Sequence, residues 1–286
     1  GTRVSLEELI NGIAVQSGND AAVVIAEGIS GSEELFADEM NSVALQLGMK
    51  DTNFTNSTGW PDDMLTITAR DLTILTAALI RDFPIKDYPY LYPVFAKPNY
   101  TYNNIKQPNR NPLINRSPGA DGLKTGSTRE SGYGLVGSAE RNGQRIILVL
   151  NGLESKKQRS LEANRLMDFM FREYKNYTFF KAGETVSTAN VWLGKEATIP
   201  LVLENELSRV LSRSERNSAK LTINYNNPIQ APVSMGDEVG TLWIEVKGVR
   251  EEVPLKAGMD VLQLPVLSRV TEAIKYLIFG AAPSIN

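Results

Sequence analysis

Four adjacent residues, Lys124-Thr125-Gly126-Ser127, have types and a spacing that could do chemistry. They precede an alternating run, Tyr133 to Ser138, which is typical of a strand. A lysine beside a threonine hydroxyl at a strand edge can bind a carboxylate, and a glycine there lets a substrate backbone approach closely. Because short tripeptides recur by chance, this hypothesis needs partners elsewhere in the chain.

A second candidate, the pair Ser17 and Asn19, lies at a glycine between two predicted helices. Apolar residues at helical spacing predict the first helix over Leu6 to Ala14. The second, Ala21 to Gly28, is almost wholly apolar, which predicts a buried helix that Asn19 or Asp20 would cap. The pair is therefore either an ordinary helix cap or a serine and an asparagine directed into a cleft.

The composition excludes several mechanisms. The 286 residues include no histidine and no cysteine, so a Ser-His-Asp triad, a Cys-His pair, a histidine-ligated zinc ion and a disulfide are impossible. Acid–base work would fall to lysines, carboxylates and hydroxyls, and we expect neither a metal nor a cofactor. Lysine and arginine total 30 against 33 aspartates and glutamates, and this net charge of −3 argues against nucleic acid as a partner.

Helices and one sheet must hold the two candidates in place. The dipeptide Asn142-Gly143 between two apolar runs predicts a tight hairpin turn. Helices before this hairpin and a long helix after it predict an α+β fold, a helical cluster with an antiparallel sheet. The predicted elements are helices over about 32–48, 68–81 and 157–174, a hairpin over 95–105, and a second hairpin that pairs 134–139 with 145–150.

The composition changes near Tyr177, where short strand-like runs separated by turn residues begin. This pattern predicts a C-terminal all-β sandwich. A terminal amphipathic helix follows, with Leu267, Val270, Ile274, Leu277 and Ile278 on one face. That helix would either pack on its own domain or lie in a membrane interface. We expect the domains to be residues 1–177, 178–264 and 265–286.

The order of the motifs resembles that of the penicilloyl serine transferases, which carry Ser-x-x-Lys, Ser-x-Asn and Lys-Thr-Gly. Here Ser17-Gly18-Asn19 precedes Lys124-Thr125-Gly126 by about a hundred residues. The surroundings resemble the low-molecular-mass penicillin-binding proteins, which are D-alanyl-D-alanine carboxypeptidases of bacterial cell walls. The stretches that carry this resemblance are Gly12–Asp20, Thr68–Leu72, Ala78–Asp82, Asn109–Asn111 and Asp121–Gly126.

The resemblance implies a serine-type carboxypeptidase that removes the terminal D-alanine from peptidoglycan pentapeptides through an acyl-enzyme, and that β-lactams inhibit. It implies catalytic roles for three residues. Ser17 would relay a proton to the leaving amine, Asn19 would hold the base lysine and the substrate amide, and Lys124 would keep Ser17 polarised.

Four further residues would bind the substrate by the same resemblance. Thr125 and Arg110 would bind its terminal carboxylate. The strand after Gly126 would pair with the substrate backbone, and the Ser127 N–H would form half of an oxyanion hole. Arg110 is equally well explained as a solvated loop charge.

The chain departs from the family at the nucleophile. No serine is followed three residues later by lysine, and Ser155, which precedes two lysines, has Gln158 at that place. We expect the attacking serine and base lysine in a segment before Gly1. The alternative is a catalytically inactive, peptidoglycan-binding homologue. A class A β-lactamase is disfavoured, because the only matching glutamate, Glu162, comes after Lys-Thr-Gly instead of before it.

The implied substrate and family also predict a location. They place the protein in the periplasm, attached to the inner membrane surface through the C-terminal helix, after secretion by a signal peptide that this chain does not contain. No leader pattern and no apolar run long enough to span a bilayer is visible in the sequence.

Overall fold

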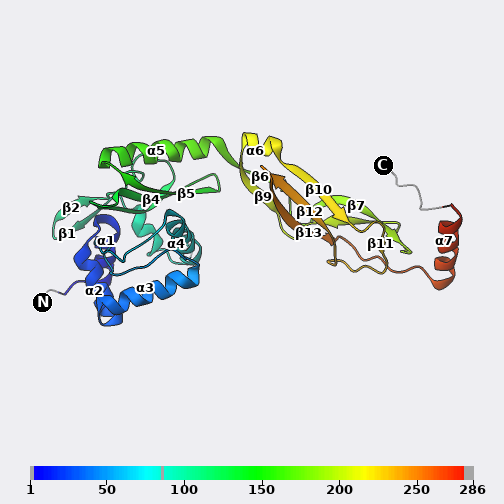
Figure 1. The fold of residues 1–286 in the computed structure, drawn as a ribbon, viewed down its shortest axis with the longest axis horizontal. Helices are drawn as coiled ribbons and strands as arrows, with labels where there is room; N and C mark the ends of the chain where they lie inside the picture. Colours follow the sequence, from blue (N-terminus) through cyan, green and yellow to red (C-terminus); the bar gives the residue numbers. More distant parts are fainter. Residues whose placement is uncertain (1–2, 85–86, 280–286) are drawn as a thin grey trace. The chain divides into compact units, whose positions relative to one another are not determined.

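The computed structural model describes residues 3–84 and 87–279 (Figure 1). The chain divides into two compact units, Gly1–Arg172 and Glu173–Asn286. Within the described ranges, no helix is both long enough and apolar enough to cross a membrane.

The first unit holds most of the helices in the described part of the chain, and their ends follow capping rules. Ser5 forms a reciprocal capping box with Glu8, and the Ser32 and Thr68 side chains accept backbone N–H groups at the starts of two further helices. Gly48 ends one of them in the left-handed conformation. The helices are α1 (Leu6–Gln16), α2 (Asn19–Ser30), α3 (Glu33–Leu47), α4 (Ala69–Asp82), the 3-10 helix η1 (Tyr92–Ala96) and α5 (Lys156–Glu173).

A three-stranded antiparallel sheet lies at the centre of this unit. Its order is β3-β4-β5, with β3 at Ala120–Thr128, β4 at Gly132–Arg141 and β5 at Gln144–Leu153. The predicted turn joins β4 to β5, with φ of 51° at Asn142 and 76° at Gly143, as a tight hairpin requires. The α+β prediction and this hairpin are confirmed.

The sheet is covered on both sides. Leu135, Ala139 and Ile146 of the sheet form one buried core with Ala163 and Met167 of α5. The N-terminal helices lie on the other side of the sheet in Figure 1, where α4 contacts β4 and β5. The strand β3 is therefore held from one side by β4 and from its faces by packed elements.

Two local predictions were wrong. The hairpin expected over 95–105 lies further along, as β1 (Asn99–Tyr102) and β2 (Ile105–Pro108), because two asparagines with positive φ make the turn and η1 occupies 92–96. The helix α2 is not wholly buried, since Val24 and Ile29 are exposed and only three alanines of α2 are buried.

The second unit is β-rich, as predicted. A six-stranded sheet of order β10-β12-β13-β8-β7-β11 and a two-stranded sheet of order β6-β9 share one core, which includes Leu207 of β9 and Leu201, Leu242 and Leu255 of the larger sheet. The elements are β6 (Tyr174–Phe180), β7 (Thr185–Trp192), β8 (Thr198–Val202), β9 (Leu207–Ser212), α6 (Arg213–Ser218), β10 (Lys220–Tyr225), β11 (Ile229–Gln230), β12 (Glu238–Val246) and β13 (Val249–Ala257). The sequence prediction missed β6, β9, β11 and α6.

The last described element is the helix α7, Val266–Phe279. Its exposed apolar residues include Val266, Leu267, Val270, Ile274 and Leu277. The expected segment 265–286 extends past residue 279, and that part lies outside the described residues.

Candidate active site

The junction of α1 and α2 forms one wall of the site. Ser17 ends α1 in the left-handed conformation, with φ 59° and ψ 47°. Its N–H donates to the Ile13 carbonyl at 3.0 Å, and the Gly18 N–H donates to the Gly12 carbonyl at 3.1 Å. These paired bonds satisfy the last carbonyls of α1. They also fix the direction in which Ser17 leaves the backbone.

Asn19 does not cap α2, and neither does Asp20. The cap residue is Gly18, and Asn19 is the first residue of the helix itself. The prediction of an asparagine or aspartate cap was wrong, because α1 and α2 are separated by only two residues, Ser17 and Gly18. Asn19 is exposed at this junction, two residues from Ser17.

The strand β3 forms the opposite wall. Within the described part of the chain it has a neighbour, β4, on one side only, so it is an edge strand. Lys124 Nζ donates to Ser17 Oγ and, at 2.9 Å, to the Thr125 carbonyl. One hydrogen bond therefore joins the two sequence motifs, which are 107 residues apart.

The Lys124 amine lies in surroundings that disfavour its charge. Burial, followed by the positive charges of Arg110 and Arg159, lowers the pKa of Lys124 to about 8. At neutral pH the amine is still mostly protonated, so it donates to Ser17 Oγ. The Ser17 hydroxyl proton then remains available for another acceptor.

The other predicted substrate residues lie along β3 and in the loop before it. Thr125 is buried and points to the opposite face of β3 from Lys124, because successive strand residues alternate. Gly126 and Ser127 are exposed at the end of the strand. Arg110 is exposed in the loop between β2 and β3, close enough for its charge to act on Lys124.

The sequence interpretation missed Arg159, on α5. It is only 7% exposed, and its Nη1 donates to the carbonyls of Gly126 at 3.4 Å and Gly134 at 3.3 Å. Burial lowers the pKa of Arg159, and the charge of Arg110 acts in the same direction. Three cations, Lys124, Arg110 and Arg159, thus act on the same region, which favours an anionic ligand.

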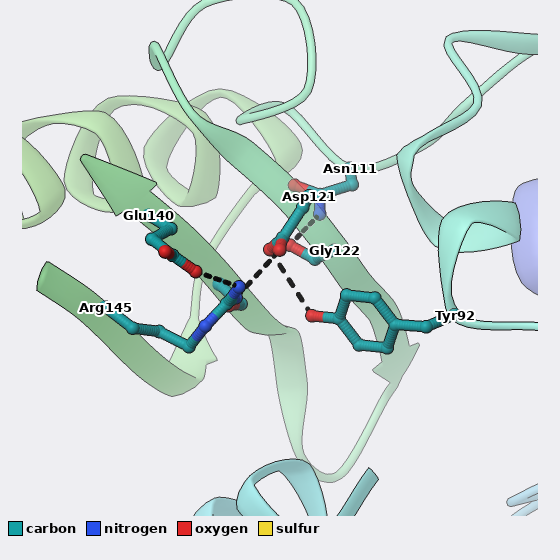
Figure 2. Close-up of polar contacts among 7 residues, drawn as sticks. Tyr92, Asn111, Asp121, Gly122, Glu140 and Arg145 are labelled. Atoms are coloured by element: carbon teal, nitrogen blue, oxygen red, sulfur yellow. Dashed lines mark hydrogen bonds and ion pairs between the residues drawn. The ribbon is translucent and has the colours of Figure 1, made fainter. Parts of the chain in front are cut away.

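A cluster of polar side chains fixes the start of β3 through hydrogen bonds (Figure 2). Arg145 of β5 donates through Nη1 to Asp121 Oδ2 and to Ser138 Oγ, both at 2.7 Å, and through Nη2 to Glu140 Oε2 at 2.6 Å. Tyr92 Oη donates to Asp121 Oδ1 at 3.3 Å. The cluster ties the start of β3 to η1 on one side and, across β4, to β5.

Tyr92 remains neutral in this cluster. Burial, and then the negative charge of Asp121, raise the pKa of Tyr92 to about 12. A neutral phenol keeps its proton and can donate to the aspartate carboxylate. The aspartate therefore has a donor from Tyr92 and another from Arg145, as a half-buried carboxylate requires.

An open hollow of about 600 Å³ lies beyond the end of β3, lined by residues 127–133 and 152–154. Ser127 contributes to its wall, so the hollow continues the site along the strand. Among the residues that the structure describes, no cluster of aspartates and glutamates has the geometry of a metal site.

An α+β unit in which an edge-strand lysine bonds to a serine between two helices is the arrangement of the penicilloyl serine transferases. Residues 1–155 match the family described as D-alanyl-D-alanine carboxypeptidase, peptidase S11, and residues 174–263 match the C-terminal domain of penicillin-binding protein 5. The chain belongs to the D-alanyl-D-alanine carboxypeptidase family.

Individual relatives agree with this assignment. The chain is 36% identical to the D-alanyl-D-alanine carboxypeptidase DacF of Bacillus subtilis, over 91% of this chain and 67% of that protein. The structure of penicillin-binding protein 5 from Haemophilus influenzae superposes with a TM-score of 0.73 at 32% identity, over 92% of this chain and 76% of that one.

A third match concerns the first part of the chain. Penicillin-binding protein D2 from Listeria monocytogenes, in its ampicillin-bound form, has a TM-score of 0.51 at 32% identity, over 57% of this chain and 66% of that one. The chain spans 61% to 68% of the length of four of the curated relatives that it matches.

Proposed function

We propose that this chain forms part of a serine-type D-Ala-D-Ala carboxypeptidase. The observation that carries the proposal is the hydrogen bond from Lys124 Nζ to Ser17 Oγ, which unites the Lys-Thr-Gly and Ser-x-Asn motifs in one site. The substrate is a peptidoglycan stem peptide that ends in D-Ala-D-Ala, and the product is the peptide shortened by one D-alanine.

The substrate carboxylate binds where positive charge gathers. Arg110 and Arg159 supply that charge, and Thr125, on the same strand as Lys124, supplies a hydroxyl. The peptide backbone pairs with the open edge of β3, and the Ser127 N–H donates to the carbonyl oxygen under attack. A peptide with an amidated C-terminus would lose the charge interaction and bind weakly.

Proton transfer runs through Ser17. A serine attacks the penultimate carbonyl, its proton passes to a lysine base, and the tetrahedral intermediate collapses with cleavage of the C–N bond. The Ser17 hydroxyl gives its proton to the departing D-alanine nitrogen and takes a proton back from the base lysine, and the Lys124 ammonium keeps that hydroxyl polarised. Asn19 holds the base lysine and the substrate amide. Water then hydrolyses the acyl-enzyme.

The attacking serine and its base come from a Ser-x-x-Lys motif, which residues 1–286 do not contain. The test therefore uses the full-length protein that the parent gene encodes. Intact-mass analysis after incubation with a labelled penicillin should show one covalent adduct, and a D-Ala-D-Ala peptide should release D-alanine. Absence of both products overturns the proposal in favour of a peptidoglycan-binding protein. Rapid turnover of the penicillin, without D-alanine release, would indicate a β-lactamase.

We also propose a location, because the substrate lies outside the cytoplasmic membrane. The protein works in the periplasm, and α7 attaches it to the membrane surface. Leu267 and Leu277 support this attachment, since they are 85% and 82% exposed. Fractionation of cells that make the full-length protein should find it with the inner membrane, on the side that faces the periplasm.

A further inference from the structure

Side-chain amides connect the two walls of the site through the segment 108–111. On the first wall, Gln16, the residue before Ser17, donates from Nε2 to the Pro108 carbonyl. On the second wall, Asn111 donates from Nδ2 to the Gly122 carbonyl of β3 at 2.8 Å, as Figure 2 shows. A short segment thus touches both the serine-bearing junction and the lysine-bearing strand.

The segment is itself fixed by further amide bonds. Asn109 donates from Nδ2 to the carbonyls of Phe95 at 3.1 Å and Lys97 at 2.9 Å. Its Oδ1 accepts the Asn111 N–H at 2.8 Å, and Asn111 Oδ1 accepts the Leu113 N–H at 3.0 Å. Each asparagine therefore uses both its donor and its acceptor on backbone groups.

A parallel tie reaches the body of α1. Lys97 Nζ donates to Asn11 Oδ1 at 2.6 Å, and Asn11 Nδ2 donates to the Glu7 carbonyl at 2.7 Å. Asn11 is 1% exposed and Asn111 is 2% exposed, so these bonds are shielded from water. In such surroundings a lost partner leaves a buried polar group unsatisfied.

We propose that Gln16, Asn109 and Asn111 form an amide bracket that positions the catalytic groups. The bracket sets the distance between Ser17 and Lys124. It also holds Arg110 beside Lys124, because Arg110 lies between the two asparagines of the bracket in sequence. The three amides are positioning residues, because they act through Ser17, Lys124 and Arg110. The inference rests on the proposed function only where it treats Ser17 and Lys124 as catalytic residues.

The structure gives a physical reason for a bracket at this place. The two walls are 107 residues apart in sequence, and in the described residues one hydrogen bond joins Ser17 to Lys124 directly. A single bond between two half-buried side chains does not fix a distance against thermal motion. Two further bonds, from the Gln16 side chain to the Pro108 carbonyl and from the Asn111 side chain to the Gly122 carbonyl, tie the same short segment to both walls and add that constraint. Displacements of about 1 Å can cost about 100-fold in rate.

Asn41 offers a matched control. Its side chain also grips a backbone pair, donating to the Phe54 carbonyl and accepting the Phe54 N–H, both at 2.7 Å. It joins α3 to the loop before α4 and takes no part in the bracket. Replacement of Asn41 by alanine should therefore remove similar bonds without moving either wall.

The first measurement uses the full-length protein. NMR titration of ¹³C-labelled lysine side chains follows the Lys124 amine. In the unsubstituted chain we expect a pKa of about 8. Asn111→Ala should release Arg110 and open the site to water, so that the Lys124 pKa rises toward that of ordinary lysines. Asn41→Ala should leave it unchanged.

The second measurement uses the full-length enzyme. Asn111→Ala should lower kcat/KM for a D-Ala-D-Ala peptide by about 10- to 100-fold, mainly through kcat, and should shift the basic limb of the pH profile upward. Asn109→Ala should act in the same direction, and Asn41→Ala should do neither.

The outcomes separate the bracket from the function. Equal Lys124 pKa values and equal activities in Asn111→Ala and Asn41→Ala overturn the bracket. An ordinary Lys124 pKa in the unsubstituted chain overturns the bracket, because the amine would then be open to water, whereas the proposed function would stand, since the amine would still be protonated and donate to Ser17. A depressed Lys124 pKa in a full-length protein that forms no penicillin adduct would retain the bracket as a structural device and reject only the enzymatic proposal.

Discussion

At the residue scale, the site holds the positive charge of Lys124 in surroundings that disfavour a charged amine. The Lys124 amine is half-buried, and Arg110 and Arg159 add like charge. A lysine whose folded pKa lies below its unfolded pKa destabilises the folded state at every pH where both forms are protonated. Function and stability are therefore opposed at this position, as they often are at active sites.

Lys124→Met should consequently stabilise the protein and inactivate it. The pKa of about 8, against an ordinary value of 10.5, corresponds to a cost of roughly 3 kcal/mol, from which the lost bonds to Ser17 and Thr125 must be subtracted. We expect the free energy of unfolding to rise by about 1–2 kcal/mol in urea denaturation at pH 7. Lys106→Met, at an exposed position, should change it by less than about 0.5 kcal/mol. A loss of stability in Lys124→Met would contradict this account.

The same shift predicts a pH dependence. Between about pH 8 and 10.5 the unfolded chain binds a proton that folded Lys124 has lost, so this residue's contribution to stability becomes more favourable as pH rises through that range. The acylation rate of the full-length enzyme should fall over the same range, as the amine loses the proton that polarises Ser17.

Arg110→Gln should move that fall in rate to higher pH. The substitution removes a positive charge that lowers the Lys124 pKa, and stopped-flow acylation by a chromogenic β-lactam would measure the change. Arg116→Gln, elsewhere in the same loop, is the control. An unchanged profile in Arg110→Gln would show that the charge of Arg110 does not lower the lysine pKa.

Arg159 shows why some site residues escaped prediction. On α5 it lies four residues before Ala163 and eight before Met167, and all three are buried. That spacing was the available signal, since a charge in phase with a buried stripe faces inward. Two apolar residues of the same helix, Leu161 and Phe169, are exposed instead. A sequence pattern weighted by hydrophobicity alone cannot place an inward-facing arginine.

At the element scale, the features that could be predicted from the sequence are those that adjacent residues determine. The Asn142-Gly143 turn is set by the residues themselves, and the structure confirms it. Ser32 and Thr68 cap helices that begin close to where the sequence predicts them. The meeting of Ser17 with Lys124 was reached only through resemblance to a family, because no local pattern encodes a contact across 107 residues. The amide bracket had no sequence signal beyond two asparagines around an arginine.

The start of β3 depends on one glycine with no room for a side chain. Gly119 has φ of 75°, and a Cβ there would lie 2.0 Å from the Glu140 carbonyl oxygen of β4. Gly143 has φ of 76° but open space around it. Gly119 and Gly143 therefore have the same backbone conformation, but only at Gly119 would an added Cβ clash with a neighbouring atom.

Gly119→Ala should therefore destabilise the protein by about 1–3 kcal/mol more than Gly143→Ala does. Thermal denaturation of both variants measures the difference. Gly119→Ala should also shift the Lys124 resonance in NMR spectra, because β3 must move away from β4. Equal losses of stability would show that β3 tolerates the displacement.

At the scale of the whole molecule, the two units differ in the candidate functional residues that they carry. The first carries the candidate active site. The second is a β-rich unit in which no chemical constellation was predicted, and it continues into α7. Arg269 of α7 donates to Gln263 at 2.9 Å, and the proposed membrane contact would rest on the exposed apolar residues of α7.

Vesicle binding should therefore depend on leucines and little on salt. The double variant Leu267→Ser with Leu277→Ser should lose most binding to vesicles of phosphatidylethanolamine and phosphatidylglycerol in flotation assays. Val249→Ser, at a residue of β13 that is 74% exposed, should bind normally. Binding of the double variant at the level of the unsubstituted chain would contradict attachment through α7.

The open edge of β3 has a consequence for substrate range. A peptide that adds itself to this sheet as a further strand is recognised through main-chain N–H and C=O groups, which every residue carries. Its side chains alternate above and below the sheet, and the main-chain bonds carry no information about them. If the proposed substrate pairs with β3 in this way, those bonds are the same for stem peptides of differing sequence. The proposed enzyme would then trim stem peptides of differing chemistry with a single site.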